Sequence, residues 1–237
     1  MTEALKKNVL FITIDGASDF EAGTKQTGPN RLLFLSKISG WLKEKGLNSI
    51  IISPVKKYAD IYRVPNFPKY PEQNQWFCFQ WFILKELPKY IKDYEYTHVC
   101  IWYYDGYPIN FDKWEDEFLD YDLVGYRLGS DGDEKYINGG FSLRSKRLIE
   151  KISEWITPEI FEDFAKEHGH YNEDMIIQSK DLGFRFAPKN INDMFSRNEI
   201  NEESFGVHID GKSFNEYIDM FLKNYDELFK TLIELKK

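Results

Sequence analysis

The sequence has few of the features that mark disulfide-rich, nucleic-acid-binding or membrane-spanning proteins. Only two of its 237 residues are cysteines, Cys78 and Cys100, in aromatic surroundings, and we expect two buried thiols. Lysine and arginine number 31 against 39 acidic residues, a net charge of −8, which disfavours a broad nucleic-acid surface. The longest apolar runs are far shorter than the roughly 18 residues of a membrane span, and the run at 9–14 is too short for a signal-peptide core. We therefore expect a soluble, cytoplasmic protein with at most peripheral membrane contact.

Aromatic residues are abundant, with 19 Phe, 15 Tyr and 6 Trp making up 17% of the chain. Hydrophobic residues reach 42%, which is typical of a globular protein. Most aromatic side chains should form the core, but sugar-binding sites also use aromatic faces, so the excess weakly favours carbohydrate chemistry. The length fits one domain, and we find no internal repeat, linker or low-complexity segment. We predict a single domain over residues 1–237.

Apolar segments alternate with amphipathic ones along the chain. This alternation predicts an α/β fold, with a sheet flanked by helices and right-handed crossovers between strands. The proline-rich stretch 55–75 is predicted to be irregular. Strands are predicted over residues 9–14, 47–53, 97–104, 122–126, 137–143 and 184–187, and helices over 29–45, 75–92, 111–119, 146–155, 173–182 and 214–235.

Asp105 and Gly106 directly follow the predicted strand 97–104. Ligands of open α/β sheets bind at such strand ends, so the Asp105 carboxylate is a candidate to face a nucleotide-sugar diphosphate through a divalent metal. The alternative is a turn aspartate, since Asp-Gly is a common turn dipeptide. An Asp-x-Asp motif is absent because Tyr103 occupies its first acidic position, which leaves metal dependence open.

A glycine pair and an acidic pair form the most informative pattern. Gly139 and Gly140 enter a short apolar strand, and Glu173 and Asp174 open the helical segment 173–182. Glycines let the backbone pass close to a ligand, and a carboxylate at a helix start suits both the helix dipole and proton abstraction. We expect Asp174 to be a general base that deprotonates a hydroxyl group of a second substrate, the acceptor, and Glu173 to orient that acceptor. The alternative is a solvated helix start, which has the same composition.

Two further residues are candidates for the acceptor side. Asn138 precedes the glycine pair, and His170 lies shortly before the acidic pair. Both are placed to line the acceptor site together with Gly139 and Gly140. The alternative for His170 is a histidine in a surface loop.

On the donor side, Asp15 and Gly16 end the first predicted strand, where we expect the nucleotide. Arg144 is a candidate to offset charge on a leaving diphosphate, with a surface role as the alternative. His208 is a candidate for a metal or diphosphate contact, and its alternative is a structural histidine.

Several motifs resemble, in order and spacing, those of the DUF5672 family, over roughly residues 75–210. The acidic pair 173–174 belongs to this set, and Trp114 follows Asp105-Gly106 as it does in the family. The other motifs are FLDYDLVG at 118–125, NGGFSLRS at 138–145, FAP at 186–188, FS at 195–196 with Glu199, and SFGVH at 204–208.

The resemblance implies a GT-A-like (Rossmann-like) domain with a mixed central sheet and glycosyltransferase activity. A nucleotide-sugar half would occupy about 1–125, an acceptor half 126–212 and a C-terminal helix 213–237. The stretch from Gly139 to Asp174 also looks like part of the β-1,4-galactosyltransferases. That similarity implies Asp174 as the base, and Asp105 with His208 as ligands of Mn²⁺ or Mg²⁺.

The resulting hypothesis is an inverting transfer of sugar from a nucleotide-sugar to a hydroxyl acceptor, such as a cell-surface polysaccharide or related glycan. Two alternatives remain open. One is an inactive protein that binds nucleotide-sugars or glycans. The other is a phage-type enzyme that adds sugar to modified DNA, which the acidic composition disfavours.

Overall fold

A six-stranded mixed sheet forms the centre of the computed structural model, which describes residues 1–15, 29–62, 75–128, 136–170, 172–199 and 203–208. Gly16 and the predicted helix 213–237 lie outside these residues. The strand order is β3-β2-β1-β4-β7-β6. Strands β1 to β4 run parallel, whereas β7 is antiparallel to both of its neighbours. The strands are β1 (Val9–Ile14), β2 (Asn48–Ser53), β3 (Ile61–Tyr62), β4 (His98–Ile101), β6 (Leu123–Leu128) and β7 (Tyr136–Ser145).

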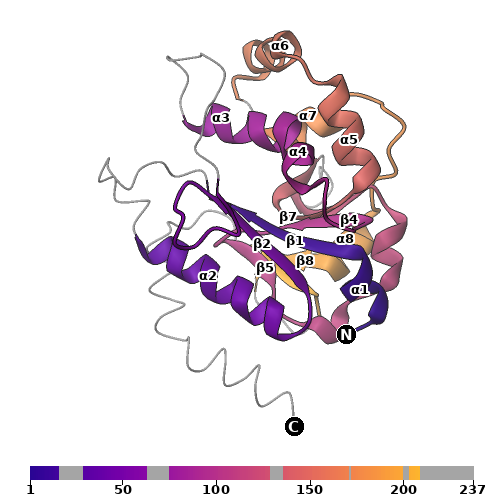
Figure 1. The fold of residues 1–237 in the computed structure, drawn as a ribbon. Coiled ribbons are helices and arrows are strands. Elements are labelled where there is room, and N and C mark those ends of the chain that lie inside the picture. Colours follow the sequence, from indigo (N-terminus) through magenta and orange to yellow (C-terminus); the bar gives the residue numbers. More distant parts are fainter. Residues whose placement is uncertain (16–28, 63–74, 129–135, 171, 200–202, 209–237) are drawn as a thin grey trace.

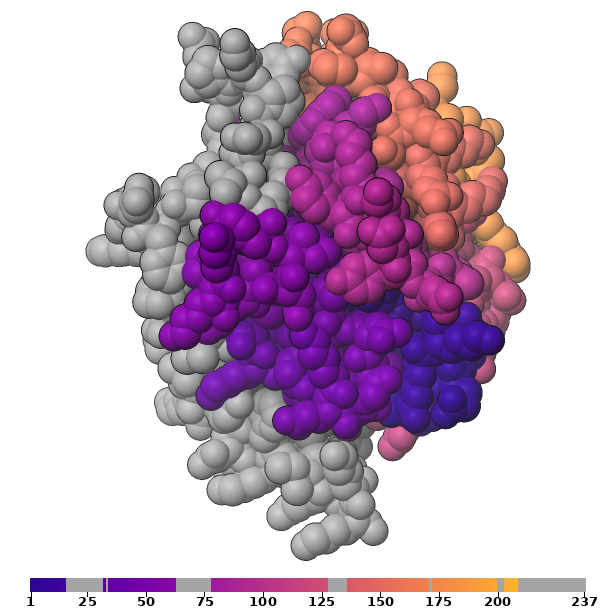
Figure 2. All heavy atoms as spheres, in the orientation of Figure 1, coloured from indigo at the N-terminus to yellow at the C-terminus, as the bar shows by residue number. Residues whose placement is uncertain are grey.

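Helices cover both faces of this sheet (Figure 1). One face carries α3 (Gln75–Trp81), the π-helix η1 (Phe82–Glu86), α4 (Leu87–Ile91) and α5 (Lys146–Trp155), with α6 (Pro158–His168) and α7 (Glu173–Ser179) nearby. The other face carries α1 (Glu3–Asn8), α2 (Pro29–Glu44), α8 (Lys189–Phe195) and the 3-10 helices η2 (Phe111–Lys113) and η3 (Asp116–Asp120). In the same orientation, the space-filling view shows parts of both faces, with α1 and α2 below α5 and α6 (Figure 2).

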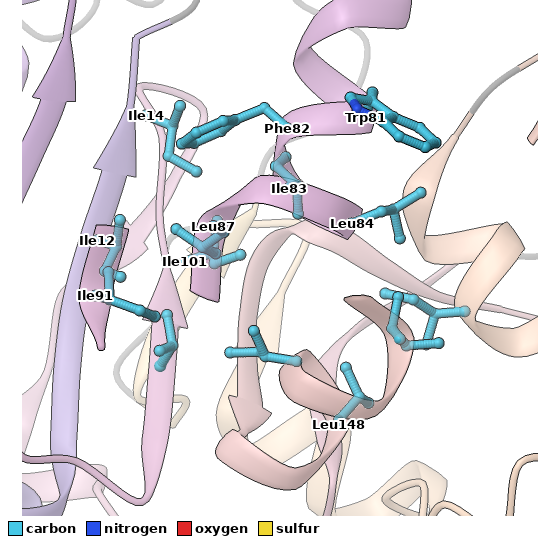
Figure 3. Packing of buried hydrophobic residues seen from close by; sticks show 14 of the residues in the cluster. Ile12, Ile14, Trp81, Phe82, Ile83, Leu84, Leu87, Ile91, Ile101 and Leu148 are labelled. Atoms are coloured by element: carbon cyan, nitrogen blue, oxygen red, sulfur yellow. The ribbon is translucent and has the colours of Figure 1, made fainter. Parts of the chain in front are cut away.

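Alternate residues of β1 belong to different halves of the core, as the two-residue period of a strand requires. Leu10, Ile12 and Ile14 pack under η1 and α4, whereas Val9 and Phe11 pack on α1 and α2. A strand buried on both faces reads as a continuous apolar run, which explains the segment 9–14. Figure 3 shows the half of the core between the sheet and the helices η1 and α4, with side chains of both helices directed toward the strands.

A second, three-stranded sheet was not predicted. Its order is β5 (Gly106–Pro108), β9 (Gly206–His208), β8 (Ser196–Arg197). The chain turns back after β4, since Tyr103 and Gly106 form an antiparallel bridge. This turn ends β4 at Ile101, earlier than the expected strand end at 104. The small sheet therefore joins the segment after β4 to the segment before residue 209.

The predicted α/β class with a mixed sheet is confirmed, and most central elements agree closely with their predicted ranges. Two local predictions were wrong, and helices α1, α6 and α8 were not predicted. The strand expected at 184–187 is a single bridge between Phe186 and Leu123, and the helix expected at 111–119 is two 3-10 helices. Helix α6 was missed although Thr157 caps it, Pro158 begins it and Gly169 (φ 76°) ends it, which are ordinary helix boundary signals. None of the described helices has the length and apolar character needed to cross a bilayer.

Asp122 ties the end of the sheet to the segment before α8. Its Oδ1 accepts from Ser145 Oγ (2.5 Å), and its Oδ2 accepts from Arg147 Nη1 (2.6 Å) and from the Arg185 backbone N–H (2.8 Å). The residue is 7% exposed. A buried carboxylate with three donors is costly to remove, because the donors lose their acceptor.

Replacing Asp122 with alanine should therefore lower the free energy of unfolding by about 2–4 kcal/mol, measured by urea denaturation. The matched control is Asp120→Ala, an exposed aspartate whose carboxylate makes no hydrogen bond within the described ranges. Equal stability of the two variants would contradict this role of Asp122.

Candidate active site

The candidate residues gather at the carboxyl edge of β1 and β4. Asp15 follows β1, and Asp105 follows β4 after the turn that begins at Tyr103. Because Ile101 pairs with Ser142 in antiparallel register, the first half of β7, which contains Gly139 and Gly140, extends past the end of β4. Three segments that are distant in sequence thus meet at the edge where ligands of α/β sheets bind.

Asp174 is held at this edge by two backbone N–H groups. Its Oδ2 accepts from the N–H of Gly139 (2.9 Å), and its Oδ1 accepts from the N–H of Met175 (2.7 Å). The side chain lies in the first turn of α7 and is 7% exposed. Each carboxylate oxygen has a second lone pair, so the group retains the capacity to accept a proton. The structure thus joins the glycine pair to the acidic pair, as the sequence pattern suggested.

Burial raises the pKa of the Asp174 carboxyl to about 7, and the negative charge of neighbouring Glu173 adds to this effect. The hydrogen bonds from Gly139 and Met175 and the charge of Arg144 act in the opposite direction. A general base works best when its pKa is near the working pH. A carboxylate tuned in this way at a strand edge is a functional-site candidate on physical grounds.

Glu173 and Arg144 form a buried ion pair. Arg144 Nη2 lies 2.7 Å from Glu173 Oε1 and also donates to the carbonyl of Gly139 (3.2 Å), while Nε donates to Ser142 Oγ (3.0 Å). The side chains of Arg144 and Glu173 are 2% and 8% exposed. This geometry changes the role expected for Arg144, because its guanidinium is occupied by Glu173 and the Gly139 carbonyl instead of being presented to a diphosphate.

We expect Glu173→Gln to lower the pKa of Asp174, because the substitution removes the negative charge that stabilises the protonated form. A titration by ¹³C NMR of aspartate side-chain carboxyls would measure the shift without any substrate, with Asp174→Asn to assign the signal. The control is Glu150→Gln, which changes an exposed glutamate on α5.

The pKa of Asp174 is higher in the folded protein than in the unfolded chain. The free energy of unfolding should therefore fall as the pH rises from about 4 to about 7, because the unfolded chain loses this proton first. Stability in Glu173→Gln should therefore vary less over that range.

The small sheet brings His208 to the same edge. His208 pairs with Gly106 in β5, the residue next to Asp105, so the backbones of the two predicted metal ligands are adjacent. The His208 side chain is buried, 4% exposed, and its ring stacks on Tyr126 at 6.1 Å between centroids. The predicted convergence of Asp105 and His208 is therefore compatible with the fold.

The glycines of the site make room for protein side chains in this structure. A Cβ on Gly140 would collide with the His208 ring, and one on Gly106 would lie 2.6 Å from His208 Cδ2. A Cβ on Gly139 would collide with Glu173 and lie 2.6 Å from Arg144 Nη2. The absence of a side chain at these positions therefore allows His208 and the ion pair to pack against the backbone.

The remaining predicted residues have local roles in this structure. Asn138 Oδ1 accepts from the N–H of Gly140 (2.6 Å) within β7. His170 lies just before α7, where its Nδ1 accepts from the Asn172 N–H (3.4 Å) and its ring packs on Phe164. Asp15 is 4% exposed and its Oδ2 accepts from Ser53 Oγ (3.4 Å).

The two predicted metal ligands, Asp105 and His208, would supply one carboxylate and one imidazole. Within the described parts of the chain, no group of three or more His, Cys, Asp or Glu residues is close enough to hold a cation by itself. Mn²⁺ and Mg²⁺ accept such a mixed set when water or phosphate oxygens complete the shell. The residues therefore fit a cation that is shared with a phosphate-bearing ligand.

Two polar residues of the site were missed from the sequence. Gln80 on α3 is fully buried, and its Oε1 accepts from the N–H of Glu173 (2.9 Å). Tyr103 lies close enough that the charges of Glu173, Arg144 and Asp105 act on its phenol. The available signal for Gln80 was one amide within the aromatic run 76–82.

Both cysteines, Cys78 and Cys100, are free and buried, as expected.

Comparison with known proteins supports the fold. A glycosyltransferase involved in the glycosylation of the major capsid of PBCV-1 superposes with a TM-score of 0.51 at 11% identity, covering 91% of this chain and 99% of that chain. The catalytic domain of Drosophila β1,4-galactosyltransferase 7, in complex with xylobiose, gives a TM-score of 0.40 at 13% identity and covers 86% and 71%. The first likeness shows the fold, which is of the GT-A-like type, whereas the second is too weak to support an argument.

In sequence, no protein of curated function matches this chain. The model of a family described as "protein of unknown function (DUF5672)" matches residues 65–214, more than half of the 237 residues. The motifs around the glycine pair, the acidic pair and His208 all fall within that range. The chain therefore belongs to the DUF5672 family.

Proposed function

We propose that this protein is an inverting glycosyltransferase that moves a sugar from a nucleotide-sugar donor to a hydroxyl acceptor. The observation that carries the proposal is the Asp174 carboxylate, which is buried at the carboxyl edge of the sheet, fixed by the Gly139 N–H, and raised in pKa to about 7. The GT-A-like fold supports it, and so does the likeness to a glycosyltransferase involved in the glycosylation of the major capsid of PBCV-1.

In the proposed reaction, Asp174 takes the proton of the acceptor hydroxyl as the acceptor oxygen attacks the anomeric carbon. The new glycosidic bond forms while the bond from that carbon to the diphosphate oxygen breaks, and the diphosphate leaves with the bonding electrons. Attack from the side opposite the leaving group inverts the configuration. A divalent cation held by Asp105 and His208 would offset the charge of the leaving diphosphate.

The donor would lie over the ends of β1 and β4, with Asp15 near its nucleotide and Asp105 near its diphosphate. The acceptor would lie on the side of β7 and α7, near Asn138, Gly140 and His170. The acceptor class we favour is a cell-surface polysaccharide or related glycan. This assignment follows the family resemblance together with the acidic composition, which disfavours nucleic acid.

The proposal is tested in two steps with the full chain. A panel of nucleotide-sugars is first screened by thermal shift with and without Mn²⁺. Donors that bind are then incubated with glycan acceptors, and the anomeric configuration of the product is read by proton NMR. Transfer with inversion supports the proposal. Retained configuration contradicts the mechanism, and donor binding without transfer or hydrolysis would indicate the inactive binding protein instead.

A further inference from the structure

Three polar groups around Glu173 have hydrogen-bonding capacity that no described residue uses. They are the amide nitrogen of Gln80, the hydroxyl of Tyr103 and the second carboxylate oxygen of Glu173. Buried polar atoms are nearly always paired, because an unpaired one loses its hydration without compensation. Several such atoms beside one carboxylate indicate that another molecule completes their bonds.

The side-chain amide of Gln80 is held in place by its oxygen, whereas its nitrogen makes no hydrogen bond to a described residue. Its side chain is 0% exposed, and Oε1 accepts from the N–H of Glu173. This bond fixes which end of the amide faces Glu173, so the position of Nε2 is fixed as well. Nε2 is buried and has no hydrogen-bond partner among the described residues. An amide NH₂ carries two donors, and both remain available.

Tyr103 is a second buried donor near Glu173, whose charge acts on its phenol. Its ring packs on Phe79, the neighbour of Gln80, with 5.6 Å between centroids. Its hydroxyl oxygen is buried and likewise lacks a partner in the part of the chain that the structure describes. A tyrosine hydroxyl carries its proton at neutral pH and can therefore donate a hydrogen bond.

Glu173 provides the matching acceptor. Oε1 is taken by Arg144, whereas Oε2 makes no hydrogen bond to any described residue. A hydroxyl group fits this arrangement, since its oxygen accepts from Gln80 and Tyr103 while its hydrogen is donated to Glu173. A phosphate does not fit, because it would have to approach the Glu173 carboxylate.

We propose that Gln80, Tyr103 and Glu173 form a subsite that binds one hydroxyl group of a sugar substrate. The subsite rests on the proposed function and deepens it. Glu173 directly precedes Asp174 in α7, and Tyr103 lies two residues before Asp105. A sugar held in the subsite would therefore be close both to the proposed base and to the expected position of the diphosphate. The aromatic rings of Phe79 and Tyr103 add apolar surface of the kind that sugar rings contact. An ordered water is the other hydroxyl-bearing occupant, and the experiment separates the two.

The test uses three probes, the methyl β-glycosides of galactose, glucose and xylose. Crystals of the full chain are soaked with each probe, and dissociation constants are measured in solution by ligand-observed NMR. For at least one probe, a sugar hydroxyl oxygen should lie within hydrogen-bond distance of both Gln80 Nε2 and Tyr103 Oη. Tyr103→Phe and Gln80→Leu should each weaken its binding by about 3- to 10-fold, the worth of one ordinary hydrogen bond.

Tyr96→Phe is the matched control, because Tyr96 is also buried but precedes β4 at the opposite edge of the sheet. It should leave binding unchanged. Tyr103→Phe should also keep the melting temperature of the wild type, because its hydroxyl makes no hydrogen bond to any described residue. A water at this position in every soak, a loss of several degrees in Tyr103→Phe, or binding that is absent or unaffected by both variants would overturn the subsite.

The two proposals fail in different ways. A wild-type protein that transfers sugar while Tyr103→Phe and Gln80→Leu behave identically to it disproves the subsite alone. A wild-type protein that binds a glycoside through these residues, yet transfers no sugar from any donor, disproves the transfer and keeps the subsite.

Discussion

Replacing Asp174 with asparagine should lower the rate of sugar transfer by about 10²–10⁴-fold, the usual contribution of a general base. The amide cannot take up the proton of the acceptor hydroxyl. The substitution has a second, smaller effect, because both carboxylate oxygens accept backbone N–H groups and an NH₂ would face one of them. A stability loss of about 1–3 kcal/mol is expected from that mismatch, so rates are compared at a temperature where both proteins are folded.

Asp181→Asn is the control for this prediction. Asp181 follows α7 at its other end, and its Oδ1 also accepts a backbone N–H, from Gly183 at 2.9 Å. This variant should keep the wild-type transfer rate. If Asp174→Asn transferred sugar nearly as fast as Asp181→Asn, Asp174 would not be the base.

Removal of divalent cations should also have a large effect, lowering transfer by about 100-fold or more, since a bound cation contributes several kcal/mol to stabilising a leaving diphosphate. Restoring Mn²⁺ should restore activity. Asp105→Ala and His208→Ala should each weaken the Mn²⁺-dependent part of donor binding, measured by calorimetry. The double variant should lose less than the sum of the two, because both residues would hold the same ion.

His98→Ala is the matched control, because His208 also fills space between Gly106 and Gly140 and its removal opens a cavity. His98 is equally buried, at 6% exposed, but lies at the start of β4, where its Nε2 contacts the Tyr121 carbonyl. It should lose stability without losing any Mn²⁺ dependence. Activity that survives EDTA unchanged would rule out the cation.

The fold could be predicted from the sequence where the signal is local and repeated. The apolar run of β1, the helical spacing of α2 and the boundary of α5 at Lys146 fall within a residue or two of their predicted ends. Helix α7 begins at Glu173 as predicted, because alternating strands and helices restrict where such a helix begins, but it ends at Ser179, three residues earlier than predicted.

The small sheet and the ion pair could not be predicted in this way. Strands β5 and β9 are three residues each, too short to show a period, and their pairing depends on tertiary contacts. The partner of Arg144 also could not be read from the sequence, because a buried guanidinium and one that binds phosphate have the same composition. The three crowded glycines were identified correctly, but whether the neighbour is a ligand or a side chain depends on the packed structure.

The pairing of β5 with β9 also has a consequence for the order in which the molecule is assembled during synthesis. Strands β1, β2 and β4 emerge early and can begin to pair, since their contacts are closer in the sequence than that of Gly106 with His208. The latter contact closes a long loop, and such contacts form late. Until residues 206–208 have been synthesised, the His208 ring that packs against Gly106 and Gly140 is missing. A nascent chain should therefore acquire its sheet before it acquires a complete site.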